Sequence, residues 1–129
     1  MILLDTSVLV DGLTGPKRSR LALRSVLESG ERCLLSSLVL YEWLGGPRLP
    51  EEIAVQEALF PSEEAIPFGP AEAALSAQLY RSLRRPRGRS LDLAIAACAI
   101  SRHIPLWTLN QGDFQDIPGL GLYQIEPGR

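Results

Sequence analysis

The sequence predicts an α/β fold in which a parallel sheet is covered by helices on both faces. Three observations favour it: the chain has 129 residues, 46% of them are apolar, and short apolar runs alternate with longer segments that carry helix signals. A chain of this length suits one domain and hides roughly two-thirds of its unfolded surface on folding. Short, continuously apolar strands between helices are typical of a parallel sheet buried on both faces.

The first strand and the first helix are marked by the residues at their ends. Residues 2–4 form a short apolar run that Asp5 interrupts, and we expect a buried strand there. The segment 15–30 has Pro16 near its start and Gly30 just past its end, which are favourable places for these residues around a helix. The chain therefore begins with a strand followed by a helix.

The next three elements are a strand and two helices. Residues 32–36 predict a second strand, and Ser36 or Ser37 can cap a helix that continues through Trp43. A further helix at 50–60 opens with a proline and two glutamates, which favour a helix N-terminus. A Gly-Gly-Pro run separates these two helices.

The second half of the chain predicts three strands, two long helices and a single helical turn. The strands fall at 65–68, 105–109 and 121–125, the helices at 70–85 and 90–102, and the turn at 111–116. Ser90 is expected to cap the second long helix, whose small residues would let it lie close to the sheet. Five short strands are therefore expected in all.

The charges are unevenly distributed, although the net charge is only −2. Residues 17–24 carry four cations and 81–89 carry five, whereas 49–80 holds six glutamates and no Lys or Arg. Two interpretations stay open: solvated helix faces, or a surface that contacts phosphate groups, which arginine's planar fork suits. In the second interpretation, the candidates near the acidic residues are Arg81, Arg84, Arg85, Arg87 and Arg89.

Cysteine, histidine and the N-terminus exclude several classes of function. Cys33 and Cys98 lie in separate apolar runs without CxxC spacing, which predicts buried thiols instead of a disulfide or a zinc site. His103 is the only histidine, so catalysis by a histidine pair is excluded, and we expect this residue at a helix C-terminus. The apolar start is interrupted by Asp5 and lacks a basic flank, which predicts a cytoplasmic protein without a signal peptide or membrane span.

Acidic and polar residues follow the predicted strands. Asp5 comes directly after the first strand, Asn110 and Asp113 follow the strand at 105–109, Glu42 lies on the helix after the second strand, and Asp92 lies in the first turn of its helix. Ligands of open α/β sheets gather beyond the carboxyl ends of the strands, near the point where strand order reverses. If the first strand and that at 105–109 are neighbours, these groups could face one cleft.

Each acid also has a structural interpretation. Asp92 could favour a helix N-terminus, Asp113 could be a turn residue, and Asp5 could cap the segment after it. Glu42 is harder to explain, because its neighbours at helical spacing in an apolar run supply no cation. A carboxylate in such surroundings either takes up a proton or finds a partner.

Converging carboxylates would raise one another's pKa, and a divalent cation would remove that conflict. Oxygen ligands suit Mg²⁺ or Mn²⁺, which bind through one or two carboxylates together with waters and substrate phosphates. Such a site can activate a water and orient it in line with a phosphodiester. The acids beside basic stretches therefore favour a metal-dependent nuclease, with the arginines on the nucleic-acid backbone.

Four segments together resemble a known family. "LLDTSVLV" at the first strand, Glu42, "SLDLAIAACA" and "LWTLNQGDF" are similar to a PIN domain, specifically the toxin component of VapBC-type toxin–antitoxin systems. The resemblance covers essentially the whole chain, so we expect a single PIN domain at 1–129. It implies a three-layer α/β/α sandwich with a central five-stranded parallel sheet. It also implies a Mg²⁺-dependent endoribonuclease that cleaves RNA and arrests translation.

The resemblance carries over to individual residues and to partners. The acids that match the family's catalytic and metal-binding set are Asp5, Glu42, Asp92 and Asp113, with Asp5 and Asp92 the leading metal ligands. The matching polar supporting positions are Ser7, Thr108 and Asn110. The implied partners are an RNA substrate, a cognate antitoxin whose C-terminal segment lies over the cleft, and a second toxin chain.

Other hypotheses remain at this stage. One is a non-catalytic module that binds the antitoxin and operator DNA, and another is a solitary PIN nuclease in RNA processing. A phosphatase of the haloacid dehalogenase type would need an aspartate where Ser7 stands and a suitable lysine, and Lys17 is the only lysine. The run around Glu42, including Tyr41, Trp43 and Leu44, is expected in the core, with an apolar contact surface as the alternative.

Overall fold

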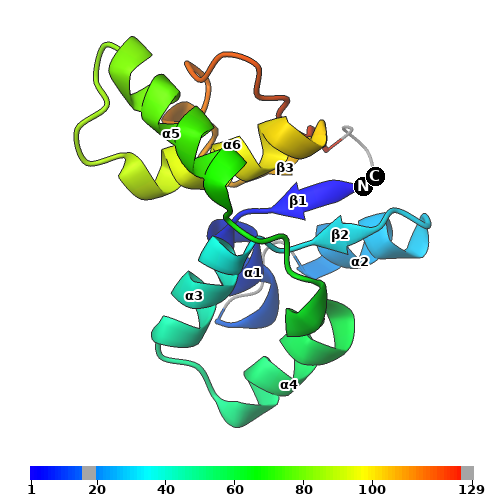
Figure 1. Cartoon of the computed structure of the whole chain (residues 1–129). Coiled ribbons are helices and arrows are strands. Elements are labelled where there is room, and N and C mark those ends of the chain that lie inside the picture. The colour runs from blue at the N-terminus through cyan, green and yellow to red at the C-terminus, as the bar shows by residue number, and fades with distance from the viewer. Residues whose placement is uncertain (16–19, 126–129) are drawn as a thin grey trace.

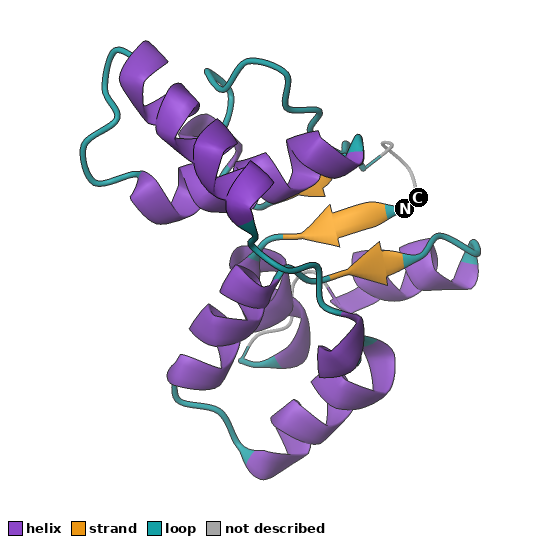
Figure 2. Ribbon diagram, in the orientation of Figure 1, coloured by secondary structure: helices purple, strands orange, loops and turns teal. Residues whose placement is uncertain are grey.

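A computed structural model describes residues 1–15 and 20–125 of the chain. In these residues the sheet has three parallel strands, β1 (Ile2–Leu4), β2 (Cys33–Leu34) and β3 (Leu106–Trp107). Their order is β2-β1-β3, and Figure 2 shows β1 between its two neighbours. The first strand and the strand predicted at 105–109 are therefore neighbours, at the point where strand order reverses.

The expected sheet of five strands is wrong in the described residues. The segments predicted at 65–68 and 121–125 each contribute a single parallel bridge, Ser36 with Ile66 and Leu106 with Leu122, at opposite edges of the sheet. Ile66 donates its N–H to the carbonyl of Leu35, but Pro67 follows it and has no N–H to continue a ladder. All five segments run parallel to their neighbours, as predicted. The outer two, however, pair through one bridge each and are too short to be strands.

Six α-helices and two 3-10 turns surround the sheet in the described part of the chain. They are α1 (Thr6–Leu13), α2 (Arg20–Glu28), α3 (Ser37–Gly45), α4 (Pro50–Leu59), η1 (Ser62–Glu64), α5 (Pro70–Ser82), α6 (Ser90–Arg102) and η2 (Gln111–Asp113). In Figure 1, α5 and α6 lie together on one side of β1, and α1, α3 and α4 lie on the other. None of the described helices is long and apolar enough to cross a membrane.

Helix α1 is not among the predicted elements, and one predicted cap is wrong. Thr6–Leu13 is short and rich in branched apolar residues, so its helical period was not recognised. Ser36 is the cap of α3 as predicted, and its hydroxyl accepts a hydrogen bond from the N–H of Val39 at 3.1 Å. Ser90, in contrast, is already the first helical residue of α6, and Arg89 stands at the cap position without a side-chain cap bond. The predicted start of the helix at 15–30, with Pro16, falls partly outside the described residues.

The core lies between the sheet and the helices. All residues of α6 from Leu93 to Ala99 are buried, and four of these seven are alanines, which lets the helix approach its neighbours closely as expected. Both cysteines are buried and free, and burial raises the pKa of each thiol to about 11. His103 ends α6 in the left-handed conformation, at the predicted helix C-terminus.

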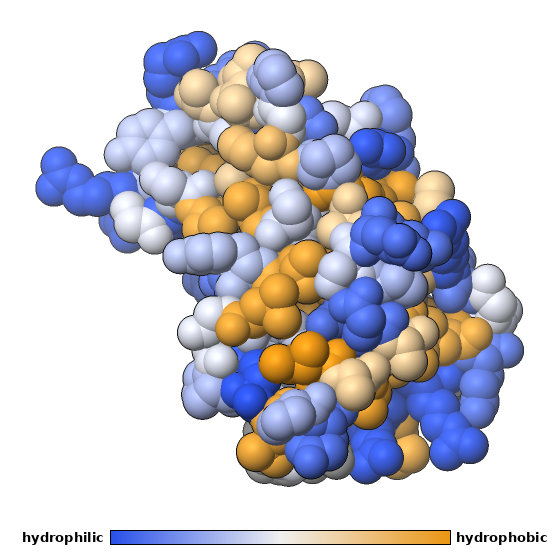
Figure 3. All heavy atoms as spheres, turned by 60° about the horizontal axis from the view of Figure 1, so that its bottom comes forward, coloured by the Kyte–Doolittle hydropathy of each residue, from blue (hydrophilic) through white to orange (hydrophobic). Residues whose placement is uncertain are grey.

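The apolar run in α3 divides between core and surface. Trp43 is fully buried as expected, but Tyr41 is 74% exposed and Leu44 is 47% exposed, so the expectation of a core position is wrong for both. Val39 and Trp43 are one helical turn apart and face the core together, which turns Tyr41 outward. Figure 3 shows apolar side chains scattered among polar ones on the face of the molecule that carries α3 and α4.

Candidate active site

Asp5 stands at the carboxyl end of β1 and is buried. Its N–H donates to the carbonyl of Trp107 in β3 at 2.9 Å, which fixes it beside the neighbouring strand. Its carboxylate oxygen Oδ2 accepts hydrogen bonds from the hydroxyls of Ser7 at 2.9 Å and Thr108 at 2.7 Å. The structure thus places two of the predicted supporting residues directly on Asp5.

The same two hydroxyls hold the loop after β3. The N–H of Leu109 donates to Ser7 Oγ, and the N–H of Asn110 donates to Thr108 Oγ1, both at 3.0 Å. Asn110, the third predicted supporting residue, therefore acts on this network through its backbone. Each hydroxyl accepts a hydrogen bond from a backbone N–H after β3 and donates one to Asp5, directly after β1. The chain segments after β1 and β3 are therefore fixed relative to each other.

Glu42 finds a partner that sequence reasoning missed. Its Oε1 accepts a hydrogen bond from the hydroxyl of Thr6, in α1, at 2.6 Å. Glu42 is partly buried, so this bond supplies part of the stabilisation that water would otherwise give the charge. The missed signal is a hydroxyl residue directly after Asp5, at the start of a helix that was itself not predicted.

Three of the four predicted acids line one pocket of about 490 Å³. Its lining consists of Asp5, Thr6, Ser7, Val10, Asp11, Thr14, Glu42, Asp92, Leu109 and Asn110. Most of these residues belong to α1 and to the loop after β3, with one acid from α3 and one from α6. Asp11 is a further acid in this pocket that the sequence analysis did not select.

Asp92 shows the electrostatic effect of this gathering. Burial is the largest cause that raises the pKa of its carboxyl from 3.8 to about 6, and the charges of Asp5, Asp113 and Glu42 raise it further, in that order. The charge of Arg89 acts in the opposite direction. The other three predicted acids are thus close enough to act on the carboxyl of Asp92.

Asp113 does not line the pocket that the other three acids share. It is exposed in η2 and lines a second pocket of about 720 Å³ with Arg84, Arg85, Arg89 and Asp116. The expectation that all four acids face one cleft is therefore met by three of them. The charge of Asp113 nevertheless contributes to the raised pKa of Asp92.

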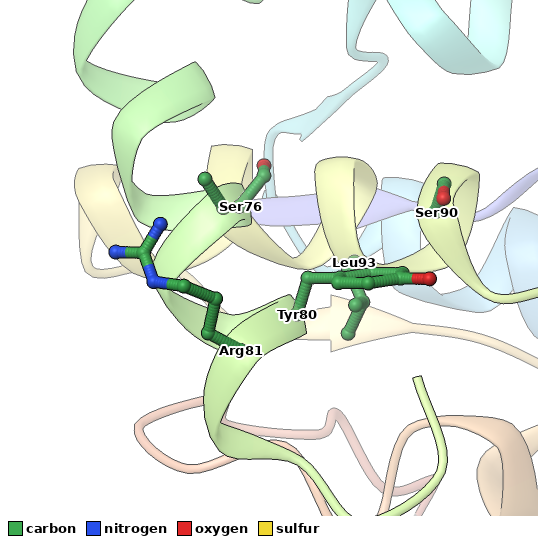
Figure 4. Close-up of a pocket in the computed structure, with 6 residues that line it drawn as sticks. Ser76, Tyr80, Arg81, Ser90 and Leu93 are labelled. Atoms are coloured by element: carbon green, nitrogen blue, oxygen red, sulfur yellow. The ribbon is translucent and has the colours of Figure 1, made fainter. Parts of the chain in front are cut away.

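The five candidate arginines do not all line one pocket. Arg84 and Arg85 line the second pocket, whereas Arg87 is exposed in the loop before α6. Arg81 lines a third pocket, of about 450 Å³, in which the ring of Tyr80 lies beside Leu93 while the Arg81 side chain extends away from it (Figure 4). Arg89 is bound within the protein by Asp116.

The donor set suits a hard cation bound with few protein ligands. In the described residues, no three His, Cys, Asp or Glu side chains form a ready-made metal cage. Asp5, Glu42 and Asp92 nevertheless line one pocket, and Mg²⁺ is commonly bound by one or two carboxylates while it keeps several waters. Burial and, after it, the neighbouring negative charges raise the pKa of Asp92, and a cation among these charges would relieve their repulsion.

The fold and this group of acids agree with the comparison to known families. Residues 2–120 match the PIN domain, and the chain belongs to the PIN domain family. It is 34% identical over 122 residues to ribonuclease VapC19 of Mycobacterium tuberculosis, covering 93% of this chain and 97% of that protein.

Solved structures show the same relationship. The chain is similar to one in the crystal structure of DNA-bound VapBC from Salmonella typhimurium, with a TM-score of 0.76, 26% identity and coverage of 95% of this chain and 96% of that one. A toxin–antitoxin complex from Klebsiella pneumoniae contains a chain with a TM-score of 0.72 and 26% identity, covering 97% of this chain and all of that one.

Proposed function

We propose that the protein is a metal-dependent endoribonuclease, the toxin of a type II toxin–antitoxin system that cleaves RNA phosphodiester bonds and so arrests translation. The observation that carries this proposal is the pocket shared by Asp5, Glu42 and Asp92 at the carboxyl end of the sheet. The likeness to a ribonuclease over 93% of this chain supports the reaction. Because this reaction acts on translation, we propose a cytoplasmic location.

In this proposal Asp5 and Asp92 hold Mg²⁺, or Mn²⁺, and Glu42 and Asp113 complete the acidic site. The ion would supply charge neutralisation and an activated water for attack on phosphorus. Ser7 and Thr108 keep the Asp5 carboxylate in one orientation by donating to a single oxygen, Oδ2. Such support matters because a small displacement of a catalytic group costs a large part of its effect.

An antitoxin is the proposed protein partner. The similar solved chains from Salmonella and Klebsiella come from structures described as VapBC and as a toxin–antitoxin complex. We expect the cognate antitoxin to lie over the acidic pocket and to stop cleavage, and we expect the toxin to assemble as a homodimer or with its antitoxin. A small reading frame beside the gene whose product binds the protein and blocks cleavage would support this assignment.

The decisive experiment measures RNA cleavage by the purified protein with Mg²⁺, with Mn²⁺ and with EDTA. We expect cleavage only with metal, and a loss of at least about 100-fold in Asp5→Asn and in Asp92→Asn, because the metal's contribution is several kcal/mol. Glu64→Gln is the control, since Glu64 pairs with Arg32 on the surface. Unchanged cleavage by Asp5→Asn would exclude the proposed site, and a folded protein without any cleavage would favour a binding module.

A further inference from the structure

Arg89 uses its side chain inside the protein. Its guanidinium forms a two-pronged pair with Asp116, in which one nitrogen donates to Oδ2 at 2.8 Å and the other to Oδ1 at 2.6 Å. The second nitrogen also donates to the carbonyl of Asp113 at 2.9 Å, and the first to the carbonyl of Arg85 at 3.2 Å. Four hydrogen bonds to three residues therefore fix one side chain.

These bonds join segments that are distant in sequence. Arg89 is the cap residue of α6, and its carbonyl accepts from the N–H of Leu93, so its backbone is fixed to the helix that carries Asp92. Asp113 and Asp116 belong to the segment after β3. That segment is anchored from within by the buried side chains of Phe114 and Ile117, and Arg89 supplies a polar anchor nearer its surface.

The geometry argues against the predicted role of Arg89 as a contact to the RNA backbone. Its side chain is only 19% exposed, although Asp116 is 53% exposed. Its charge is paired with that of Asp116, and binding a phosphate in place of this carboxylate would break a two-pronged pair. Arg84 and Arg85, both exposed, line the same pocket and remain available for that role.

The hydrogen bonds of the Arg89 side chain oppose the repulsion between the carboxylates of Asp113 and Asp92. Asp113 is exposed on a short 3-10 turn, and the side chain of Arg89 joins its carbonyl to the start of α6, where Asp92 lies in the first turn. Two like charges favour separation unless the backbone that carries them is held. The hydrogen bond from Arg89 to the carbonyl of Asp113 holds that backbone directly, and the bonds to Asp116 hold it three residues further along.

We propose that Arg89 is a positioning residue, which through Asp116 and the carbonyl of Asp113 fixes the Asp113 carboxylate relative to Asp92 and so completes the acidic site. This role rests on the proposed nuclease function. Outer residues that orient metal-binding groups typically contribute 10- to 100-fold to metal affinity or activity. Arg89 therefore affects the reaction without touching RNA.

The experiment compares Arg89→Lys, Asp116→Asn and the double variant. Arg89→Lys keeps the charge but loses the planar fork, and Asp116→Asn removes a negative charge that would repel RNA. For each variant, kcat and KM for RNA cleavage, the Kd for RNA in EDTA and the Kd for Mn²⁺ without RNA are measured. Arg32→Lys and Glu64→Gln are the matched controls, because they alter another Arg–carboxylate pair, at 3.5 Å. Circular dichroism and thermal melting report whether each variant folds.

We expect both single variants to lose about 10-fold or more in kcat and to bind Mn²⁺ more weakly, with an RNA Kd within about twofold of the original. The kcat of the double variant should be no lower than that of the single variants, because both substitutions remove the same Arg89–Asp116 pair. Full activity in Asp116→Asn, or weaker RNA binding in Arg89→Lys without a change in Mn²⁺ affinity, would overturn the proposal. If Arg89→Lys fails to fold, the result for Asp116→Asn decides whether the proposal holds.

The positioning role of Arg89 can be tested separately from the proposed nuclease function. If the unaltered protein does not cleave RNA, the nuclease assignment fails, and the Mn²⁺ affinities alone then decide whether Arg89 positions the acids. Unchanged Mn²⁺ affinity in both variants would exclude the positioning role in that case.

Discussion

Asp92 shows how one carboxyl group acquires its properties from its surroundings. In the sequence it resembles any acid in the first turn of a helix, a place that normally favours the charged form. In the folded protein, burial and three other carboxylates act in the opposite direction and raise its pKa to about 6. The raised pKa means that the folded protein disfavours the charged form of Asp92 in the absence of a cation.

We predict that Asp92→Asn stabilises the metal-free protein in a pH-dependent manner. The pKa of Asp92 is higher in the folded than in the unfolded chain, so the folded form binds the proton more tightly, and stability falls as pH rises from about 4 through about 6. In EDTA at about pH 7.5, the variant should exceed the original by about 1 kcal/mol, with solvent screening of this half-buried group allowed for.

The difference should disappear at about pH 4, where both side chains are neutral in the folded protein. Urea unfolding monitored by circular dichroism at a series of pH values measures it. A constant difference across the whole range would show that burial and neighbouring charges do not act on Asp92 as described.

At the scale of elements, the contact between α1 and α3 explains the charge within the apolar run of α3. Glu42 is oriented by Thr6, and these residues are 36 positions apart. Val39 and Trp43 point into the core from the same helix, so the packing of α3 and the position of its carboxylate are set together. The helix thus serves the core on one face and the acidic pocket on another.

We predict that Thr6→Val lowers RNA cleavage by at least about tenfold, because a hydrogen bond to a charged group contributes about 1.5–3 kcal/mol. Thr6→Ser keeps the hydroxyl and is the matched control.

We predict that Glu42→Gln stays folded and is at least as stable as the original protein, since the amide oxygen can still accept a hydrogen bond from Thr6, while RNA cleavage falls. Cleavage rates and urea unfolding measure these effects, and a large loss of stability in Glu42→Gln would instead indicate a structural role.

At the scale of the whole molecule, charges of opposite sign meet at one end of the sheet. Asp5 and Asp113 follow the carboxyl ends of β1 and β3, and the loop before α6 brings Arg84 and Arg85 to the pocket that contains Asp113. The net charge of −2 gives no general attraction to nucleic acid. Any affinity for RNA must therefore come from this local arrangement, and it should depend on salt.

We predict that Arg84→Gln and Arg85→Gln each reduce the salt dependence of RNA binding. For single-stranded nucleic acid, one lost phosphate contact lowers the slope of log affinity against log salt by about 0.7. Fluorescence anisotropy with labelled RNA in EDTA at several salt concentrations measures this slope. Arg32→Gln, which lies before β2 and pairs with Glu64, is the control. Slopes that match the original in both variants would exclude these arginines from the RNA surface.

Much of the fold was predictable because its signals are local. The apolar run at 2–4, the cap at Ser36 and the proline at the start of α4 each act through neighbours within a few residues. The acids after the strands were predictable for a related reason, since parallel strands place their carboxyl ends at the same edge. Chain order and residue type were enough for these features.

The sequence by itself therefore determined the alternation of strands and helices and the residue types of the site. The sequence left open the reversal of strand order at β1, which is set by the pairing of β1 with both β2 and β3. Only the tertiary structure decided that Thr6 orients Glu42, that Arg89 binds Asp116 across 27 residues, and that Asp113 lies in a second pocket. It also decided that the two outer segments pair through single bridges. The physical reason is that hydrogen bonds between distant residues depend on how whole elements pack, which no local pattern of residues records.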